Sequence, residues 1–216
     1  METTTSTLSK PESYLKLTLR QLGRNRSAKS GLIILSLLIL SAVLAPQLAP
    51  YDPLEMDFTV RLASPSAEHW FGTDEFGRDI LSMLLYGGRI SLLVGVVAVT
   101  FALFFGVTFG VLAGYFPKLD NLIMRITDVW LAFPTFLLAI AIVAILGPGL
   151  TNAMIAVGVA STPQYIRVVR GAVLSVKEQE YIAAAKALGA RNGRIILSHV
   201  LPNVMAPIII LSTLQF

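Results

Sequence analysis

Few side chains in this sequence suit catalysis or metal binding. The 216 residues include no cysteine and two histidines, His69 and His199, neither of which lies in a metal-ligand pattern. Disulfides and thiolate metal sites are therefore excluded, and each histidine is expected to make an ordinary polar contact. The GxxxxGKS/T phosphate loop, the HExxH zinc pattern and the GxSxG nucleophile pattern are also missing. We predict no catalytic residue, no cofactor and no metal.

The composition instead indicates a membrane protein. Hydrophobic residues make up 55% of the chain and charged residues 14%, against roughly a quarter charged in a soluble domain. The mean hydropathy is +0.71. Because the apolar residues also lie in long blocks, we predict an all-α fold, a polytopic bundle of membrane-spanning helices.

The apolar blocks divide the chain into five spans and the segments between them. A bilayer core of about 30 Å needs about 20 apolar helical residues, which sets the length of each span. The predicted order is a cytoplasmic tail (1–30), span 1 (31–48), an extracytoplasmic loop (49–88), span 2 (89–115), a cytoplasmic turn (116–121), span 3 (122–146), an extracytoplasmic turn (147–149), span 4 (150–169), a cytoplasmic loop (170–203) and the start of span 5 (204–216).

Spans 1, 3 and 5 depart from a plain apolar helix. A cleaved signal peptide is the alternative for span 1, but its polar lead is long and Pro46 is a poor residue at a cleavage site. Pro134 is expected to kink span 3, where Asp128 is expected to pair with Arg125. Span 5 holds residues for about 20 Å of helix, so we expect it to be truncated.

The basic residues set the orientation. All but three of the 17 lysines and arginines lie in or next to the tail, the 116–121 turn and the 170–203 loop. The positive-inside rule places these segments, and the amino terminus, in the cytoplasm. The same distribution explains the sequence pI of about 9.5, so we predict no nucleic-acid binding. Lys177, in the 170–203 loop, is expected to be a solvated charge of little energetic weight.

Small residues recur at every fourth position of span 2. Such a row lets a second helix approach closely, which matters in lipid because the hydrophobic effect does not drive helices together there. We interpret the row as internal helix packing, with a dimer interface as the alternative. The residues are Ala98, Ala102, Gly106, Gly110 and Gly114.

The 170–203 loop is predicted to contain a short docking helix. Ser175 and Glu178 form a capping-box pattern, and Gly189 can end the helix in the left-handed conformation. The centre, Ala183-Ala184-Ala185, carries almost no side chain, which favours docking into a groove of another protein. A helix lying at the membrane interface is the alternative.

The predicted extracytoplasmic loop (49–88), called the outer loop below, carries polar residues and glycines shortly before span 2. Thr73 is placed to cap a helix whose first turn holds Asp74 and Glu75. Gly87-Gly88 would then end that helix before span 2 begins. We expect this run to have a structural role rather than to contact a substrate directly.

The 170–203 loop resembles the EAA loop of ABC importer permeases, whose pattern is E-A-A-x3-G-x9-I-x-L-P. Ala183 stands where the family has Glu, and His199 where it has Ile. The resemblance implies that this loop couples the protein to an ATP-binding subunit. The matching positions are Ala183, Ala184, Ala185, Gly189, Leu201 and Pro202.

The outer run from His69 resembles the H-x-F-G-T-D-x-x-G-R-D signature of the C-type permease subunit of dipeptide, oligopeptide and nickel importers. The matching positions are Phe71, Gly72, Thr73, Asp74, Gly77, Arg78 and Asp79. The resemblance implies a type I ABC importer permease with six spans, in the cytoplasmic (inner) membrane of a bacterium or archaeon. It also implies the import of di- or oligopeptides, driven by ATP hydrolysis.

The same resemblance implies a set of partners. These are a homologous permease that forms a heterodimer with this subunit, two ATP-binding subunits, an extracytoplasmic solute-binding protein and membrane lipid. Import of nickel or another small solute is the alternative. A secondary transporter is less favoured because Asp128 is the one acid within spans 1 to 4. A membrane enzyme is disfavoured because no acid–base or metal cluster is visible.

Overall fold

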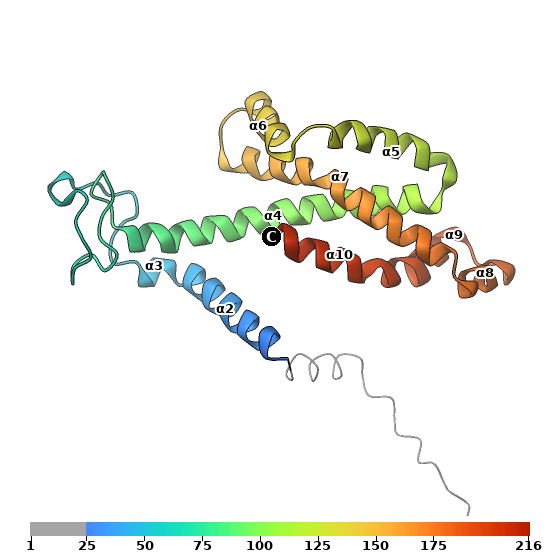
Figure 1. Cartoon of the computed structure of the whole chain (residues 1–216), viewed down its shortest axis with the longest axis horizontal. Helices are drawn as coiled ribbons and strands as arrows, with labels where there is room; N and C mark the ends of the chain where they lie inside the picture. The colour runs from blue at the N-terminus through green and yellow to red at the C-terminus, as the bar shows by residue number, and fades with distance from the viewer. Residues whose placement is uncertain (1–24) are drawn as a thin grey trace, which may run out of the picture. The chain divides into compact units, whose positions relative to one another are not determined.

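The structure, a computed structural model, describes residues 25–216. They form two units, one ending at Ile90 and one comprising Ser91–Phe216. The regular elements are helical (Figure 1), and the described residues contain one isolated β-bridge, between Thr73 and Asp79. The prediction of an all-α fold is confirmed. Residues 1–24 of the predicted tail lie outside the described residues.

The first unit contains α2 (Arg26–Val43), α3 (Ala45–Leu48), the 3-10 turn η1 (Phe58–Val60) and the start of α4. Helix α2 begins before the predicted residue 31, because the Asn25 side chain accepts hydrogen bonds from the N–H groups of Ser27 and Ala28. Most leucines and isoleucines of α2 are exposed, as expected for a helix in contact with lipid.

Helix α4 (Ile80–Tyr115) begins earlier than the predicted span 2. It has 36 residues and a length of about 54 Å, longer than a bilayer core of about 30 Å. The predicted end of a helix at Gly87-Gly88 is wrong, because α4 continues through both glycines. A glycine costs a helix about 1 kcal/mol, but helix formation is cooperative and a helix of 36 residues continues through two such positions.

The predicted span 3 is divided into two helices. Helix α5 (Pro117–Leu131) begins with a proline. The first N–H groups of a helix have no hydrogen-bond acceptor within it, so a residue without an N–H is tolerated there. Helix α6 (Thr135–Leu146) follows Pro134, and the two helices meet at 90°. Because proline disfavours the helical conformation in the residue before it, the expected kink is a full break.

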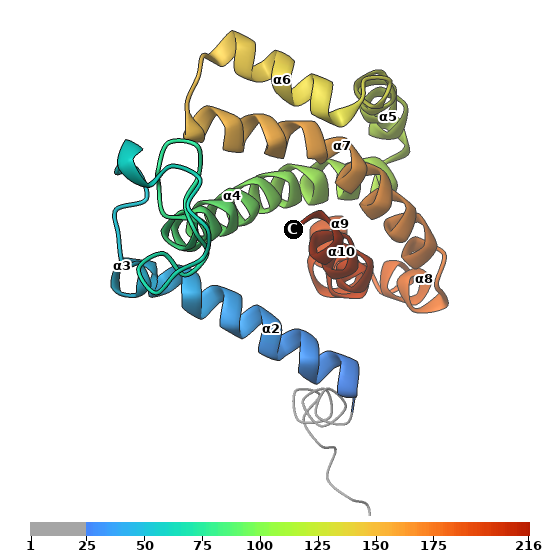
Figure 2. The ribbon, with the colours of Figure 1, turned by 60° about the vertical axis from the view of Figure 1, so that its left-hand side comes forward.

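Helix α7 (Leu150–Lys177) is central to the second unit. It packs against α5, α6 and α10 (Leu201–Gln215), and it lies beside the second-unit part of α4 in both ribbon views (Figures 1 and 2). The prediction that Ser175 and Glu178 start a helix is wrong, because α7 continues to Lys177. Val169 and Val173, both 0% exposed, extend its buried face toward that end.

Three short elements join α7 to α10. They are α8 (Glu180–Ala187), α9 (Asn192–Ile195) and the π-helical turn η2 (Ile196–Val200), which continues into α10 without a break. Side chains from these elements, α4, α7 and α10 form one hydrophobic core. Its fully or nearly buried members are Val111, Tyr115, Val169, Val173, Ile182, Ile195, Val200, Val204 and Ile208.

Three helices in residues 25–216 are long and apolar enough to cross a membrane: Arg26–Val43, Ile80–Tyr115 and Asn192–Gln215. The bent pair α5 and α6 makes a fourth if it counts as one span. Helix α7 is not among them, since it carries polar residues such as Thr162 and Gln164. The assignment of residues 150–169 as span 4 stays a prediction, as do the other boundaries.

Candidate functional site

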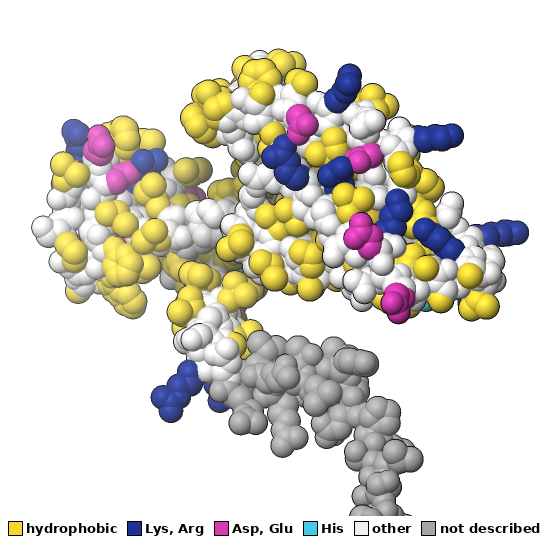
Figure 3. Space-filling view, turned by 45° about the vertical axis from the view of Figure 1, so that its right-hand side comes forward, with side chains coloured by type: hydrophobic (Ala, Val, Ile, Leu, Met, Phe, Trp, Pro, Cys, Tyr) yellow, Lys and Arg dark blue, Asp and Glu magenta, His cyan; other side chains and the backbone are white. Residues whose placement is uncertain are grey.

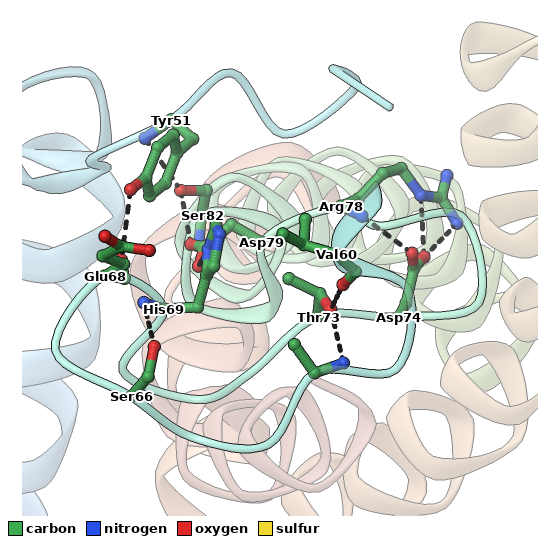
Figure 4. Close-up of polar contacts among 11 residues, drawn as sticks. Tyr51, Val60, Ser66, Glu68, His69, Thr73, Asp74, Arg78, Asp79 and Ser82 are labelled. Atoms are coloured by element: carbon green, nitrogen blue, oxygen red, sulfur yellow. Dashed lines mark hydrogen bonds and ion pairs between the residues drawn. The ribbon is translucent and has the colours of Figure 1, made fainter. Parts of the chain in front are cut away.

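The sequence-predicted residues lie in two separate regions, one in each unit. In the first unit, Asp79 joins the outer loop to the start of α4 (Figure 4). Its Oδ2 accepts hydrogen bonds from the backbone N–H and the hydroxyl of Ser82, both at 2.8 Å, and its Oδ1 lies 3.0 Å from Nδ1 of His69. Asp79, which is 2% exposed, is therefore the N-cap of α4. The prediction that Thr73 caps a helix is wrong, because the chain from 73 to 79 is an irregular loop.

Thr73 instead ties two crossing parts of the outer loop together. Its hydroxyl donates a hydrogen bond to the carbonyl oxygen of Val60 and accepts one from the N–H of Ala63 at 2.9 Å. The N–H of Thr73 donates to the carbonyl oxygen of Ala63 at 3.1 Å. Because Thr73 is buried, loss of its hydroxyl would leave both partners without a hydrogen bond.

Asp74 and Arg78 close the turn that lies between them. Oδ1 of Asp74 accepts hydrogen bonds from the N–H groups of Phe76 and Arg78 at 2.8 and 2.9 Å. Nε of Arg78 donates to Oδ2 of Asp74 at 2.7 Å. Burial raises the pKa of Asp74, but the hydrogen bonds from Arg78 and Phe76 outweigh it and leave the pKa below its ordinary value. The turn is therefore held by a charged carboxylate at neutral pH.

Gly72 and Gly77 both have a φ of +75°, in the left-handed region. A Cβ at Gly72 would collide with the carbonyl oxygen of Ala63, and one at Gly77 with the carbonyl oxygen of Asp57. Both the backbone conformation and the close approach therefore require glycine. The remaining signature residue, Phe71, is 53% exposed, and the adjacent Trp70 is 68% exposed.

Tyr51 belongs to the same network, although no pattern in the sequence indicated it. Its ring lies 4.8 Å from that of His69, and its N–H donates to the Ser82 hydroxyl at 3.2 Å. Tyr51 and His69 line a pocket of about 130 Å³ with Glu55, Asp57 and Asp79. In the part of the chain that the structure describes, no group of three metal-binding side chains occurs and each buried side-chain polar atom has a partner. The outer loop is thus arranged to hold its own shape.

In the second unit, the stripe of small residues on α4 faces α7. Ala98 and Ala102 are buried. A Cβ at Gly110 would lie 2.6 Å from Cβ of Val169, and one at Gly114 would lie 2.7 Å from Cβ of Val173. A Cβ at Gly106 would overlap the Tyr165 side chain. The stripe therefore lets α4 and α7 pack so closely that the backbone of α4 contacts α7 directly.

The predicted docking helix is α8. Ile182 is 0% exposed and anchors it to the core, whereas Tyr181 and Leu188 are 44% and 88% exposed. Ala183 and Ala184 are exposed, and Ala185 packs against the core. Gly189 follows the helix with a φ of +81°, and its N–H donates to the carbonyl oxygen of Lys186 at 2.9 Å.

The bonds around Gly189 form a Schellman motif. The N–H of Ala190 donates to the carbonyl oxygen of Ala185 at 3.1 Å, which completes the pair of bonds typical of this helix end. Nothing lies within 4 Å of the Cβ position of Gly189. Glycine is therefore needed here for its conformation and not because of neighbours within the chain.

Leu201 and Pro202 lie in the first turn of α10, directly after the π-helical turn. The N–H of Leu201 donates to the carbonyl oxygen of Ile196, five residues earlier. A proline has no N–H and its ring crowds the carbonyl four residues before it, so a wider turn accommodates Pro202 within a continuous helix.

Ion pairs connect α5 to α7. Nε and Nη2 of Arg170 donate to the two carboxylate oxygens of Asp120 at 2.5 and 2.7 Å. Asp128 lies 2.7 Å from Arg167, so the predicted pairing of Asp128 with Arg125 is wrong. Arg125 lies three residues before Asp128 in the sequence, but the packing of α7 against α5 brings Arg167 within ion-pair distance of Asp128.

Lys177 is not the solvated charge that was expected. Its Nζ donates to the carbonyl oxygen of Tyr115 at 3.0 Å, in a partly buried environment. The Tyr115 side chain, 5% exposed, reaches Asn192 on α9. No sequence pattern indicated Tyr115 or Asn192, because the contact joins residues far apart in the chain.

Two family models match the chain. Residues 106–216 match the binding-protein-dependent transport system inner membrane component. Residues 13–65 match the N-terminal transmembrane domain of oligopeptide transport permease C.

Three relatives illustrate the similarity. The dipeptide transport system permease of Alkalihalophilus pseudofirmus is 54% identical over 91% of this chain and 65% of the relative. The di/tripeptide transport system permease of Pseudomonas aeruginosa is 44% identical over 94% of this chain and 70% of the relative. The dipeptide transport system permease of Bacillus subtilis is 41% identical over 94% of this chain and 63% of the relative. The chain thus spans about two thirds of the length of these relatives.

Proposed function

Because the chain belongs to the family of binding-protein-dependent transport system inner membrane components, we propose that it forms part of a permease subunit that imports di- or oligopeptides. The named relatives transport dipeptides or di- and tripeptides, which supports this substrate class over nickel. The permease forms the pathway and performs no chemistry. ATP is hydrolysed by its partners, since the sequence holds no phosphate loop.

The observation that carries the coupling role is the exposed apolar surface of α8, which ends in a left-handed Gly189. Tyr181, Ala184 and Leu188 recur at three- and four-residue spacing, so they share one side of the helix. Ile182, on another side, holds the helix to the core. A short helix with small side chains fits a groove in an ATP-binding subunit, as the EAA-loop resemblance implies.

The charge distribution supports the orientation. Basic side chains gather over one side of the second unit, in α5, α7, α8 and α9 (Figure 3). By the positive-inside rule this side and the amino terminus face the cytoplasm, and the outer loop faces the opposite compartment. Two ATP-binding subunits then bind on the cytoplasmic side, a homologous permease completes a heterodimer, and a solute-binding protein delivers peptide from outside. The complex lies in the cytoplasmic (inner) membrane.

Valine at Gly189 tests this proposal. A side chain in the left-handed region costs roughly 1–2 kcal/mol, and valine also adds bulk at the end of α8. We expect Gly189→Val to reach the membrane at normal abundance, to retain less of the ATP-binding subunits and to import less than a tenth as much labelled dipeptide.

Gly193→Val is the matched control. Gly193 lies in the first turn of α9, its φ is not positive, and nothing lies within 4 Å of its Cβ position. We expect it to import peptide at close to the wild-type rate. If Gly189→Val imports peptide at the wild-type rate with its partners bound, α8 is not the coupling element.

A further inference from the structure

Tyr115 connects the end of α4 to the two helices, α7 and α9, that flank α8 in the chain. It is the last residue of α4, and its hydroxyl donates to Oδ1 of Asn192, the first residue of α9, at 2.9 Å. Its carbonyl oxygen accepts the hydrogen bond from Nζ of Lys177, the last residue of α7, at 3.0 Å. One residue therefore joins two helix ends and a helix start.

The ring of Tyr115 makes a second set of contacts. The ammonium groups of Lys177 and Lys186 lie 5.8 and 5.6 Å from its centroid, within the range of a cation–π interaction. Lys186 belongs to α8 itself. The ring also packs in the core that contains Ile182 and Ile195, the buried residues of α8 and α9.

The apolar packing and the polar contacts of Tyr115 constrain α8 and α9 in different ways. Apolar packing around Ile182 holds α8 close to the core, but it is non-directional. A hydrogen bond and a cation over a ring face have preferred directions, so they determine the orientation of α8 and α9 relative to α4 and α7. A docking helix that transmits a movement needs a fixed orientation as well as attachment.

We propose that Tyr115 is a positioning residue: its hydrogen bond to Asn192 fixes the start of α9 and, through the contact of α9 with α8, the orientation of α8 for coupling. This inference rests on the proposed function of α8. The hydroxyl, rather than the ring, carries the orienting contact to α9, so Tyr115→Phe removes it while the ring and its packing remain. Asn192→Ala removes the same hydrogen bond from the other side.

The first experiment compares the amount of peptide imported with the amount of ATP hydrolysed in the reconstituted transporter. We expect Tyr115→Phe and Asn192→Ala to retain the ATP-binding subunits but to import about fivefold less peptide for each ATP hydrolysed. That factor corresponds to a net hydrogen bond of about 1 kcal/mol. The double variant should be no worse than either single variant, because both remove one interaction.

Tyr86→Phe is the control, since Tyr86 lies in the same helix and its hydroxyl makes no hydrogen bond within residues 25–216. The second experiment does not depend on transport. Cysteines at Lys118 and Ala187, both exposed, carry spin labels in a chain with no native cysteine. The distance distribution between the labels should be broader in Tyr115→Phe than in the wild type.

The two experiments separate this inference from the proposed function. A wild-type protein that neither retains ATP-binding subunits nor imports peptide contradicts the proposed function. If the wild type imports peptide, an unchanged import ratio in Tyr115→Phe overturns the positioning role, and so does an unchanged distance distribution.

Discussion

Replacing Gly110 by alanine should force α4 and α7 apart. The added Cβ would lie 2.6 Å from Cβ of Val169 and 2.9 Å from the carbonyl oxygen of Ile166. Non-bonded carbon atoms pack at about 3.5–4.0 Å, so the shortfall is roughly 1 Å. Because one of the colliding atoms belongs to the backbone of α7, a side-chain rotation cannot relieve the contact. Overpacking of this kind typically costs about 1–3 kcal/mol.

Gly88→Ala is the matched control for this effect. Gly88 lies in the same helix, and nothing lies within 4 Å of its Cβ position, so alanine should stabilise the helix by up to about 1 kcal/mol. Both variants gain the same helix propensity. The difference between their free energies of unfolding therefore isolates the collision and should be about 1–3 kcal/mol.

The measurement is the free energy of unfolding of the purified protein in mixed micelles of a mild detergent and SDS, followed by circular dichroism. Gly110→Ala should unfold at a lower SDS fraction than the wild type, and Gly88→Ala at the same fraction or a higher one. Equal stability of the two variants would refute the reasoning, since it would mean that α4 and α7 are not in backbone contact at Gly110.

Two further predictions concern the outer loop and the orientation. Burial raises the pKa of Asp79, but the hydrogen bonds from Ser82 and His69 outweigh it, so the pKa lies below its ordinary value of about 4. The stability that the carboxylate contributes is thus complete above about pH 4 and is lost as the pH falls below it. Hydrogen exchange of the Ser82 amide, corrected for its intrinsic rate, should accelerate as the pH falls below about 4 in the wild type and should change less in Asp79→Asn. The same pH dependence in both proteins would contradict this. A cysteine at the exposed Ser66 should react with a membrane-impermeant thiol reagent in intact cells and one at the exposed Ser175 should not, whereas the reverse pattern would overturn the orientation.

The features that could be predicted from the sequence are those with local causes. The apolar blocks specify membrane helices because about 20 apolar residues match the bilayer core. A glycine after a run of helix-forming residues marks a helix end, and Gly189 has the expected left-handed conformation. The proline at 134 interrupts a helix whatever its surroundings, and the structure shows the break.

The features that could not be predicted depend on contacts between distant residues. Thr73 and Asp79 are both suited to capping a helix, so the sequence alone does not decide between them. In the structure, hydrogen bonds with Ser82 and His69 hold Asp79 at the start of α4. Ser175 fits a capping box, but α7 continues past it to Lys177 and is held by the buried Val169 and Val173. Tyr115 and Asn192 meet across 77 positions of sequence, which no local pattern could indicate.

The π-helical turn fixes the rotational phase of the last helix. The buried residues before, within and after it are Ile195, Val200, Val204 and Ile208, so the intervals are five, four and four residues. An α-helix turns by about 100° per residue, and an interval of five would move the next residue off the buried face. The wider turn absorbs that extra residue and keeps all four side chains on one side. One more residue between Gly189 and Pro202 would rotate α10 by about 100° relative to α8 and carry Val204 and Ile208 away from the core. The length of this segment is therefore constrained more strictly than its composition, and homologous chains should vary here by substitution rather than by insertion.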